Sequence, residues 1–297
     1  MEARSERQCG RSPRAQRSLD AMSSVGVLAP EEVRIRKFPP LTTERALRFA
    51  APLVGIALLL MVWAVGGWLI ESNPAIAAFS GFSPRHTLAR FYSMLLDGSA
   101  AAAATPSLAR IAGGLGFAIV IGAPVGVLIG RSALFRAVTH LPFQFLRMIS
   151  PLAWMPIAIL AFPTWNGAIV FLIAAAAIWP VIFATANGLK KLDPDWFKLA
   201  HNLGANRWHV LTAVIAPAIA QDMLTGVRLA LGVAWIVLVP AEYLGVTSGL
   251  GYAINDARDT LEYDRLAAMV LVIGLIGFAL DGLLLALISR VAWTRHD

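Results

Sequence analysis

The sequence predicts an all-α integral membrane protein with six transmembrane helices. Of its 297 residues, 58% are hydrophobic and only 14% are charged, and the mean hydropathy is +0.67. A water-soluble domain of this size would need a far more polar surface to stay dispersed. Several runs without a charged residue also approach or exceed the roughly 20 residues that a helix needs to cross the hydrocarbon of a bilayer.

The chain begins with a polar segment, residues 1–48, that lacks helical periodicity. We expect it to be a disordered or surface-lying cytoplasmic tail, and either Met1 or Met22 could be its true start. It holds 10 of the 25 Lys and Arg residues of a chain whose net charge is +7. Basic residues that flank a first span commonly set its orientation, and no aromatic–basic motif for nucleic acid accompanies them.

Six predicted spans follow the tail, and residues 291–297 form a short polar C-terminus. The approximate bounds of the spans are 49–70, 107–130, 137–162, 167–189, 223–244 and 266–289. The first and the fourth contain no charged residue. Between the first two spans, residues 71–105 form a periplasmic or interfacial segment, in which Pro84–Leu96 could form a short amphipathic helix at the membrane surface.

The distribution of basic residues orients these spans. With the N-terminus in the cytoplasm, the inside collects the tail, Arg131, Arg136, Lys190, Lys191, Lys198, Arg207, Arg290 and Arg295. The outside collects Arg85, Arg90, Arg258 and Arg265, which are offset by acidic residues. An excess of Lys and Arg on the cytoplasmic side is the usual arrangement. It places residues 190–221 and both termini in the cytoplasm.

Small residues recur every four positions in the second span, at Gly114, Ala118, Gly122, Gly126 and Gly130. At this spacing they form one smooth stripe along a helix face. Small side chains let another backbone approach closely, and helices in lipid have little other drive to associate. Glycine is common in membrane helices generally, but five positions in register favour a helix-packing surface.

The polar insert between spans four and five predicts two short helices joined by a tight turn. Asp193 and Pro194 form a favourable helix start, because Asp caps free N–H groups and proline fits the first turn. An apolar face follows at helical spacing, formed by Trp196, Phe197, Leu199, Ala200 and Leu203. Gly204 ends this helix, and Pro217 breaks a second helix over Asn206–Ile215 before span five. Such a rigid knob could move with a partner protein; the alternative is a loop lying on the membrane surface.

The insert resembles the EAA loop of ABC importer permeases, a motif of E-A-A, three residues, G, and then I-x-L-P. Ala200, Gly204 and Pro217 match at the expected spacing, and Val214 is the aliphatic residue. The departures from the motif are Lys198 for the glutamate, Leu199 for the first alanine and Ala216 for the leucine.

Four other stretches resemble the nitrate/sulfonate/taurine branch of these permeases. They are SLARIAGGLGFAIVIGAPVGVLIG (107–130), ISPLAWMPIAIL (149–160), AIWPVIFATANGL (177–189) and GVRLALGVAWIVLVPAEYLGVTSGLGYAI (226–254). The resemblance implies a type I ABC importer permease fold, with a transmembrane domain over residues 106–290 and a cytoplasmic coupling helix pair in the loop 190–221. It also implies a transport subunit of the bacterial inner membrane rather than an enzyme, importing a small anion such as nitrate, a sulfonate or taurine.

The partners implied by the resemblance are ABC ATPase subunits, a second permease copy or close paralogue, and a periplasmic or lipid-tethered solute-binding protein. ATP and Mg²⁺ would be bound by the ATPase and no cofactor by this chain, which has no G-x-x-x-x-G-K-[ST] loop for nucleotide phosphates. The implied ATPase contacts are Asp195, Trp196, Lys198, Leu199, Ala200, Leu203, Gly204, Ala205, Arg207 and Pro217.

Candidates for the solute pathway are Arg147, Ser150, Trp154, Arg228 and Glu242. Ionisable groups at membrane depth are costly, so each calls for an explanation. If the third span begins near residue 137, Arg147 lies about 15 Å into the bilayer at ~1.5 Å per residue; alternatively, it anchors a span that begins at residue 148. Arg228 and Glu242 could instead snorkel toward opposite surfaces, and Trp154 is equally suited to packing. We expect Asp281 to pair with a base on a neighbouring helix.

Metal and catalytic sites are not indicated. The one cysteine, Cys9, allows no disulfide within the chain, and the five histidines lack the spacing of ligands on one helix face. The spans hold no evident catalytic constellation. A secondary transporter or channel is the main alternative, but it would need no two-helix knob, and it often shows inverted repeats that the segments 49–162 and 167–290 lack.

Overall fold

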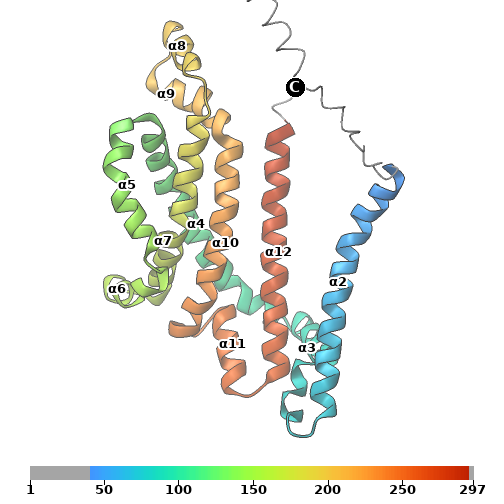
Figure 1. Ribbon diagram of the computed structural model, residues 1–297. Helices are drawn as coiled ribbons and strands as arrows, with labels where there is room; N and C mark the ends of the chain where they lie inside the picture. The colour runs from blue at the N-terminus through green and yellow to red at the C-terminus, as the bar shows by residue number, and fades with distance from the viewer. Residues whose placement is uncertain (1–40, 294–297) are drawn as a thin grey trace, which may run out of the picture. The chain divides into compact units, whose positions relative to one another are not determined.

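The computed structural model describes residues 41–293, which form helices joined by short connections (Figure 1). No strand occurs in this part of the chain, in agreement with the all-α prediction. The chain divides into two compact units, residues 1–58 and 59–297, and the described part of the first unit is the beginning of helix α2. The helices are α2 (Leu41–Ser72), α3 (Pro84–Leu96), α4 (Ser99–Arg131), α5 (Ala133–Met148), α6 (Met155–Ala161), α7 (Trp165–Lys190), α8 (Pro194–Asn202), α9 (Arg207–His209), α10 (Ala216–Gly245), α11 (Leu250–Asp259) and α12 (Tyr263–Trp293).

Five stretches of helix among the described residues are long and apolar enough to cross a membrane. They are Ala50–Ser72, Ser99–Arg131, Trp165–Lys190, Val210–Gly245 and Tyr263–Val291. The segments Ala133–Met148 and Pro151–Ala161 meet at 88° and provide a sixth span only if the bent pair counts as one. The span predicted within 137–162 therefore corresponds to this bent pair rather than to one straight helix. Pro151 and Pro156 lack the N–H groups that a continuing helix would need.

Other boundaries also differ from the sequence prediction. Residues 41–48, assigned to the tail, already belong to α2, whereas residues 1–40 and 294–297, including both candidate starts, lie outside the described part. Helix α3 has the predicted bounds. Pro217 does not end the second helix of the polar insert, because a π-helical segment, Val210–Ile215, leads directly into α10. Pro217 thus stands two residues after the π-helical segment, where its missing N–H leaves one backbone hydrogen bond of the helix unmade.

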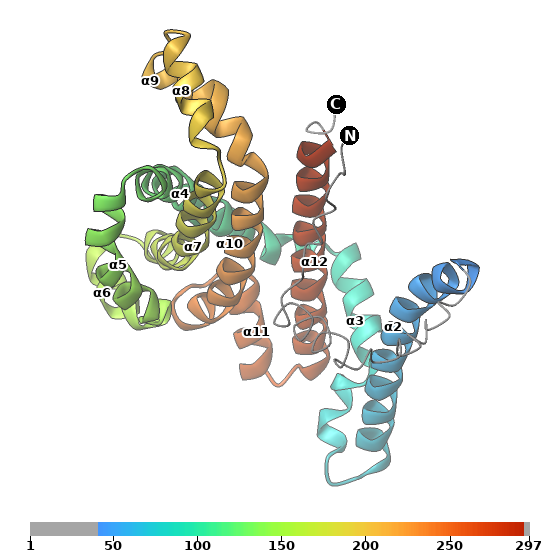
Figure 2. The same ribbon diagram turned by 45° about the horizontal axis from the view of Figure 1, so that its top comes forward.

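The core of the second unit forms where α4, α7 and α10 lie side by side, with α5 and α6 on one side and α12 on the other (Figure 2). The stripe of small residues on α4 faces α7. Gly114, Gly122, Gly126 and Gly130 lie against Ile173, Val181, Thr185 and Leu189, respectively. Ala118, in the middle of the stripe, is completely buried. The two backbones therefore approach closely, which gives the van der Waals contact that holds helices together in lipid.

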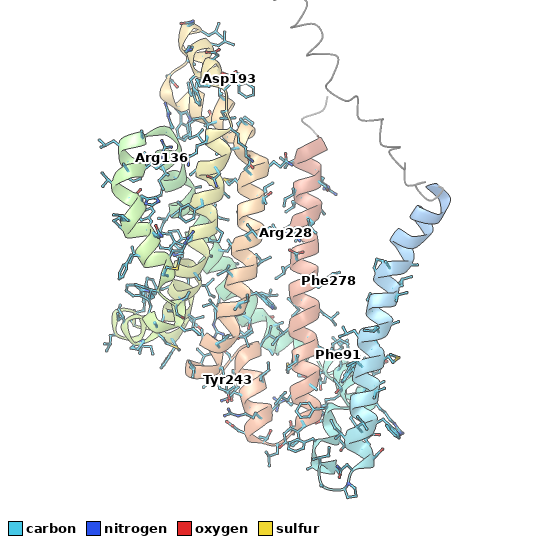
Figure 3. The ribbon with its side chains drawn as sticks, viewed as in Figure 1. Phe91, Arg136, Asp193, Arg228, Tyr243 and Phe278 are labelled. Carbon is cyan, nitrogen blue, oxygen red and sulfur yellow. The ribbon has the colours of Figure 1, made fainter. Side chains whose placement is uncertain are left out.

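The two ends of this unit differ in structure. Helices α8 and α9 lie at one end, and α3 and α11 lie at the other (Figure 1). Among the labelled side chains of Figure 3, Asp193 lies at the first end and Tyr243 lies toward the second. At the second end, Arg265 bridges Asp256 of α11 at 2.9 Å and Glu262 at 3.2 Å, so ion pairs join α11 to the start of α12.

Replacing Gly126 by alanine should weaken the packing of α4 on α7. The added Cβ would lie 2.7 Å from the carbonyl oxygen of Ile182 and 2.7 Å from Cβ of Thr185, so the helices must move apart. We expect a loss of about 1–3 kcal/mol in the free energy of unfolding, the usual cost of overpacking, measured in mixed detergent micelles. Gly116→Ala is the control, because nothing lies within 4 Å of its added Cβ. An equal loss in both variants would contradict the packing argument.

Candidate functional site

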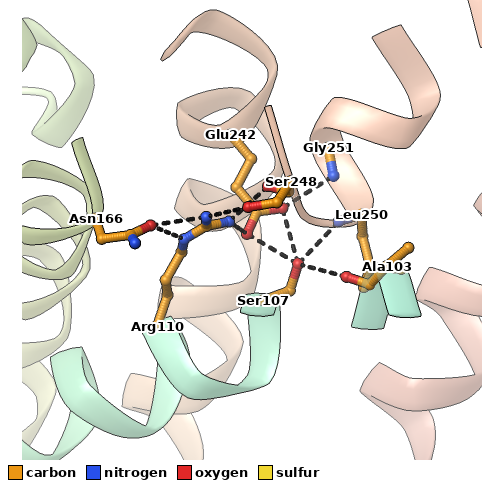
Figure 4. Close-up of polar contacts among 8 residues, drawn as sticks. All are labelled: Ala103, Ser107, Arg110, Asn166, Glu242, Ser248, Leu250 and Gly251. Carbon is orange, nitrogen blue, oxygen red and sulfur yellow. Dashed lines mark hydrogen bonds and ion pairs between the residues drawn. The ribbon is translucent and has the colours of Figure 1, made fainter. Parts of the chain in front are cut away.

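A buried pair of charged side chains lies where α4, α7, α10 and α11 meet (Figure 4). Arg110 is 4% exposed and Glu242 is 0% exposed, and Nη1 of Arg110 donates directly to the carboxylate of Glu242. Ser107 Oγ donates to the same carboxylate at 2.8 Å, and the backbone N–H of Gly251 donates to it at 3.0 Å. The carboxylate is thus surrounded by donors, which makes its burial tolerable.

The N–H groups of the Arg110 guanidinium are also all hydrogen-bonded within the protein. Its Nε and Nη2 donate to Oδ1 of Asn166 at 2.9 and 2.8 Å. Its Nη1 donates to the carbonyl oxygen of Ser248 at 2.8 Å, and its Nη2 donates to the hydroxyl of Ser248 at 2.9 Å. Every nitrogen of the guanidinium therefore has a protein partner, and no N–H group is left over to bind a solute.

The same cluster holds the start of α11. Ser107 Oγ accepts the N–H of Leu250 at 2.8 Å, while Glu242 accepts the N–H of Gly251. These two N–H groups belong to the first turn, where a helix offers them no partner of its own, and the carboxylate lies at the positive end of the helix dipole. Gly249 precedes them with a φ of +116°, which favours glycine. The cluster therefore fixes the connection between α10 and α11.

A second site, which we call the knob, consists of α8, α9 and the turn between them, residues 194–209. Oδ1 of Asp193 accepts the N–H of Asp195 at 2.9 Å, and Oδ1 of Asn206 accepts the N–H of His209 at 2.7 Å, so both helices start with a capping side chain. Gly204 has a φ of +74° in the turn that ends α8. The first of the two predicted short helices is therefore present, whereas the second continues through the π-helical segment into α10.

An apolar groove with a volume of about 490 Å³, which we call the groove of the knob, lies between α8 and residues 213–218. Its lining residues are Trp196, Leu199, Ala200, Leu203, Ala213, Val214, Pro217 and Ala218. Leu199 is 60% exposed and Leu203 is 78% exposed, which is unusual for leucines on a polar, charged segment. A contiguous exposed apolar surface rimmed by polar residues is typical of a protein–protein contact.

The other predicted contact residues belong to α8, α9 and the turn between them, but they are not among the residues that line the groove. Lys198 and Asp195 form an exposed ion pair at 2.6 Å, and Ala205 is half-buried beyond the turn. Arg207 belongs to α9, but its side chain lies outside the described part.

Two contacts of Phe197 join the knob to the membrane helices, and an ion pair just before the knob joins the end of α7 to α10. Phe197 packs against a buried cluster formed by Leu189, Ile215 and Ile219. The guanidinium of Arg131, at the end of α4, lies 5.9 Å from the centroid of the Phe197 ring. Lys191 pairs with Asp222 of α10 at 2.6 Å. A movement of α8 would therefore be passed to α4, α7 and α10.

The five predicted pathway residues do not gather at one place. Arg147 lies at the end of α5, with its guanidinium 5.2 Å from the centroid of the Phe183 ring. Ser150 is exposed just beyond it, and Trp154 is half-buried and packs against the core. These three residues follow one another along the bent segment, but they face different surroundings.

The remaining two pathway candidates are both engaged in ion pairs. Arg228, labelled in Figure 3, pairs with Asp281 of α12 through hydrogen bonds of 2.6 and 2.8 Å, as expected for Asp281. Glu242 is completely buried inside the cluster with Arg110. The sequence reasoning overlooked Arg110, although an ionisable residue inside a long apolar helix is itself a signal. Its pairing with a residue 132 positions later depends on helix packing.

Residues 118–293 match the family of binding-protein-dependent transport system inner membrane components. The chain is similar to the bicarbonate transport system permease protein CmpB of Synechococcus elongatus, with 35% identity over 64% of this chain and 66% of the relative. It is also similar to the nitrate import permease protein NrtB of Synechocystis, with 30% identity over 86% of this chain and 94% of the relative. A probable ABC transporter permease protein of Brucella melitensis shares 32% identity over 81% of this chain and 98% of the relative.

The chain spans 66% of the length of the first of these curated relatives. A chain from the MetNI methionine ABC transporter, solved in inward-facing conformations, has a similar fold, with a TM-score of 0.52 at 16% identity over 63% of this chain and 93% of that chain. This likeness supports the predicted type I importer permease fold. A family of transport-system components also agrees with the expectation that the chain is not an enzyme.

Replacing Glu242 by glutamine should strongly destabilise the second unit. The amide cannot neutralise Arg110, which stays buried, and removing one partner of such a pair typically costs about 3–5 kcal/mol. Asp259→Asn is the matched control, because it makes the same chemical change in the exposed pair with Arg258 and should cost about 0–1 kcal/mol. Unfolding in mixed micelles measures both variants. Equal losses of unfolding free energy in the two variants would show that the buried Arg110–Glu242 pair contributes no more to stability than the exposed pair.

Proposed function

Because the chain belongs to the family of binding-protein-dependent transport system inner membrane components, we propose that it is the permease subunit of an ATP-driven importer for a small anion. Its five long apolar helices and one bent pair suit a multi-pass protein of the inner membrane. In this proposal the chain forms the pathway through the membrane. ATP and Mg²⁺ are bound by a separate ATPase, which supplies the energy.

The apolar groove of the knob is the observation that carries the proposal. A helix pair that extends from the membrane helices and exposes Leu199 and Leu203 provides a docking surface for a partner protein. In the proposed complex each permease copy presents its knob to one ATPase subunit. The end that carries α8 and α9 then faces the cytoplasm together with both termini, and α3 and α11 face the solute-binding protein.

The proposed mechanism uses the contacts between the knob and the membrane helices. When ATP closes the paired ATPase subunits, the two knobs are drawn together. Phe197 and the Lys191–Asp222 pair pass this movement to α4, α7 and α10, so the pathway changes from inward-open to outward-open. ATP can shift this equilibrium only through its different affinities for the two states.

A small oxyanion is the substrate class that we favour. Two of the similar proteins are named as permeases for bicarbonate and nitrate, and sulfonates and taurine carry a similar anionic group. The chain also places Arg147 at the end of α5, where it has no acidic partner among residues 41–293. An unpaired cation at membrane depth is suited to attracting an anion.

A charge in the groove should prevent docking of the ATPase. Leu203→Glu places a carboxylate on the exposed apolar surface without disturbing buried contacts, because Leu203 is 78% exposed. We expect the variant to insert normally but to lose co-purification with its ATPase and to lose uptake. Leu96→Glu is the control for ATPase co-purification, which it should leave intact, since it alters a similarly accessible leucine, 71% exposed, on α3, at the end away from the knob. Normal co-purification and uptake by Leu203→Glu would refute the docking role.

The substrate class is tested with the complete complex in proteoliposomes. The ATPase activity should rise when the binding protein is loaded with its solute, and the candidates are nitrate, bicarbonate, taurine, alkanesulfonates and aromatic acids. A response to one of these anions is expected. Stimulation by neutral or cationic solutes alone would overturn the anion assignment.

A further inference from the structure

A cavity between α5 and α7 has an unusually basic lining. Its volume is about 270 Å³, and its polar lining residues include Arg136, His140, Gln144, Arg147, Asn187 and Lys190. The first four stand on one face of α5 at helical spacing, and the last two stand on the facing side of α7. The lining contains three cationic side chains and no acidic one.

The orientation of α5 explains why the lining of this cavity is polar. Its other face carries exposed apolar side chains, namely Leu134, Val138, Leu141, Phe145 and Met148. The helix therefore turns its apolar face outward and its polar face toward α7. In a membrane protein such an arrangement is expected around a cavity that holds water or ions, because polar groups cannot be left in lipid.

The cations of the cavity have no acidic partner in the described part of the chain. None of Arg136, Arg147 and Lys190 takes part in an ion pair there, whereas Arg110 and Arg228 both do. Within the cavity, the guanidinium of Arg147 makes a cation–π contact with the ring of Phe183. This contact holds the guanidinium in place and leaves its N–H groups free to donate to an anion.

We propose that the cavity between α5 and α7 binds a small oxyanion and is a site that the imported solute occupies near the cytoplasmic end of its route. This inference rests on the proposed function for the identity of the anion. Arg147 and Lys190 supply charge-assisted hydrogen bonds to its oxygens, and Gln144 and Asn187 supply neutral donors. Such bonds to Arg and Lys are the strong interactions by which proteins recognise oxyanions.

The phosphate of a lipid headgroup has the same chemistry, but the position of Arg147 favours a free anion. Arg136 and Arg147 are eleven residues apart on α5, which is about 16 Å at ~1.5 Å per residue. Arg136 lies near the start of α5, whereas Arg147 lies near the bend before Pro151. A headgroup phosphate at the membrane surface could reach one of these cations, whereas a small free anion could be passed from one to the other.

The test uses the purified full-length chain in nanodiscs of phosphatidylcholine, with thermal unfolding followed by tryptophan fluorescence. Sodium nitrate, bicarbonate or ethanesulfonate is compared with sodium chloride at the same ionic strength. At least one oxyanion should give a saturable rise in the unfolding temperature. Arg147→Gln and Lys190→Gln should each raise the apparent Kd at least about tenfold, the effect of losing one charge-assisted hydrogen bond.

Two variants separate a site from a general charge effect. Arg290→Gln removes a cation from the last turn of α12, away from the cavity, and should leave the oxyanion response unchanged. Arg147→Lys keeps the charge, so it should retain most of the response that Arg147→Gln loses, provided that both variants are monodisperse and helical. Equal weakening by Arg290→Gln, or no saturable response in the wild-type chain, would overturn the proposal.

Two further measurements assign the source of the anion and separate this proposal from the function itself. If phosphatidylglycerol in the nanodisc raises the unfolding temperature through Arg147 and no soluble oxyanion does, the cavity is a lipid site and the proposal fails. In proteoliposomes with ATPase and binding protein, Arg147→Gln should reduce oxyanion import. Unchanged import would overturn the role of the cavity while leaving the importer intact, whereas a wild-type complex that imports no oxyanion would overturn the proposed substrate class.

Discussion

The buried ion pair between Arg110 and Glu242 determines how the helices of the second unit meet. An isolated charge inside a membrane protein is costly, so each of the two groups is stable only while its partners stay in place. Those partners come from three helices and one connection: Ser107 from α4, Asn166 from α7, Gly251 from α11, and Ser248 from the segment between α10 and α11. A shift of any one helix would leave a buried charge unsatisfied.

The end of the unit that carries α8 and α9 exposes a surface for contact instead of burying charged groups. The knob exposes apolar side chains, and it is joined to α10 by the π-helical segment Val210–Ile215 rather than by a regular helix. Such segments often occur at functional positions. A continuous helical stretch, Val210–Gly245, connects this end to the Arg110–Glu242 pair. The structure therefore combines a firmly held end with an end built to contact a partner, and a single long helix links the two.

The bent pair α5 and α6 forms the third distinctive part of the unit. Pro151 and Pro156 prevent the bent pair from crossing the membrane as one straight helix. The polar face of α5 is turned toward α7. As a result, Arg147 lies beside a cavity that also contains Arg136 and Lys190. Residues that are distant in the sequence thus form one basic surface. The buried cation Arg110 is thus paired within the helix core, whereas three cations that are unpaired among the described residues are grouped around this cavity.

The sequence by itself determined the features that depend on composition and local spacing. Charge-free runs predicted the long helices, four-residue spacing predicted the stripe that lies against α7, and Asp193 with Gly204 predicted the ends of α8. These signals are local, because each reflects how a single segment behaves toward lipid or its own backbone. Only the tertiary structure decided the partner of Glu242, the 88° bend after α5 and the grouping of cations between α5 and α7. Those features depend on which helices pack together, and nothing in the spacing of one segment specifies its neighbours.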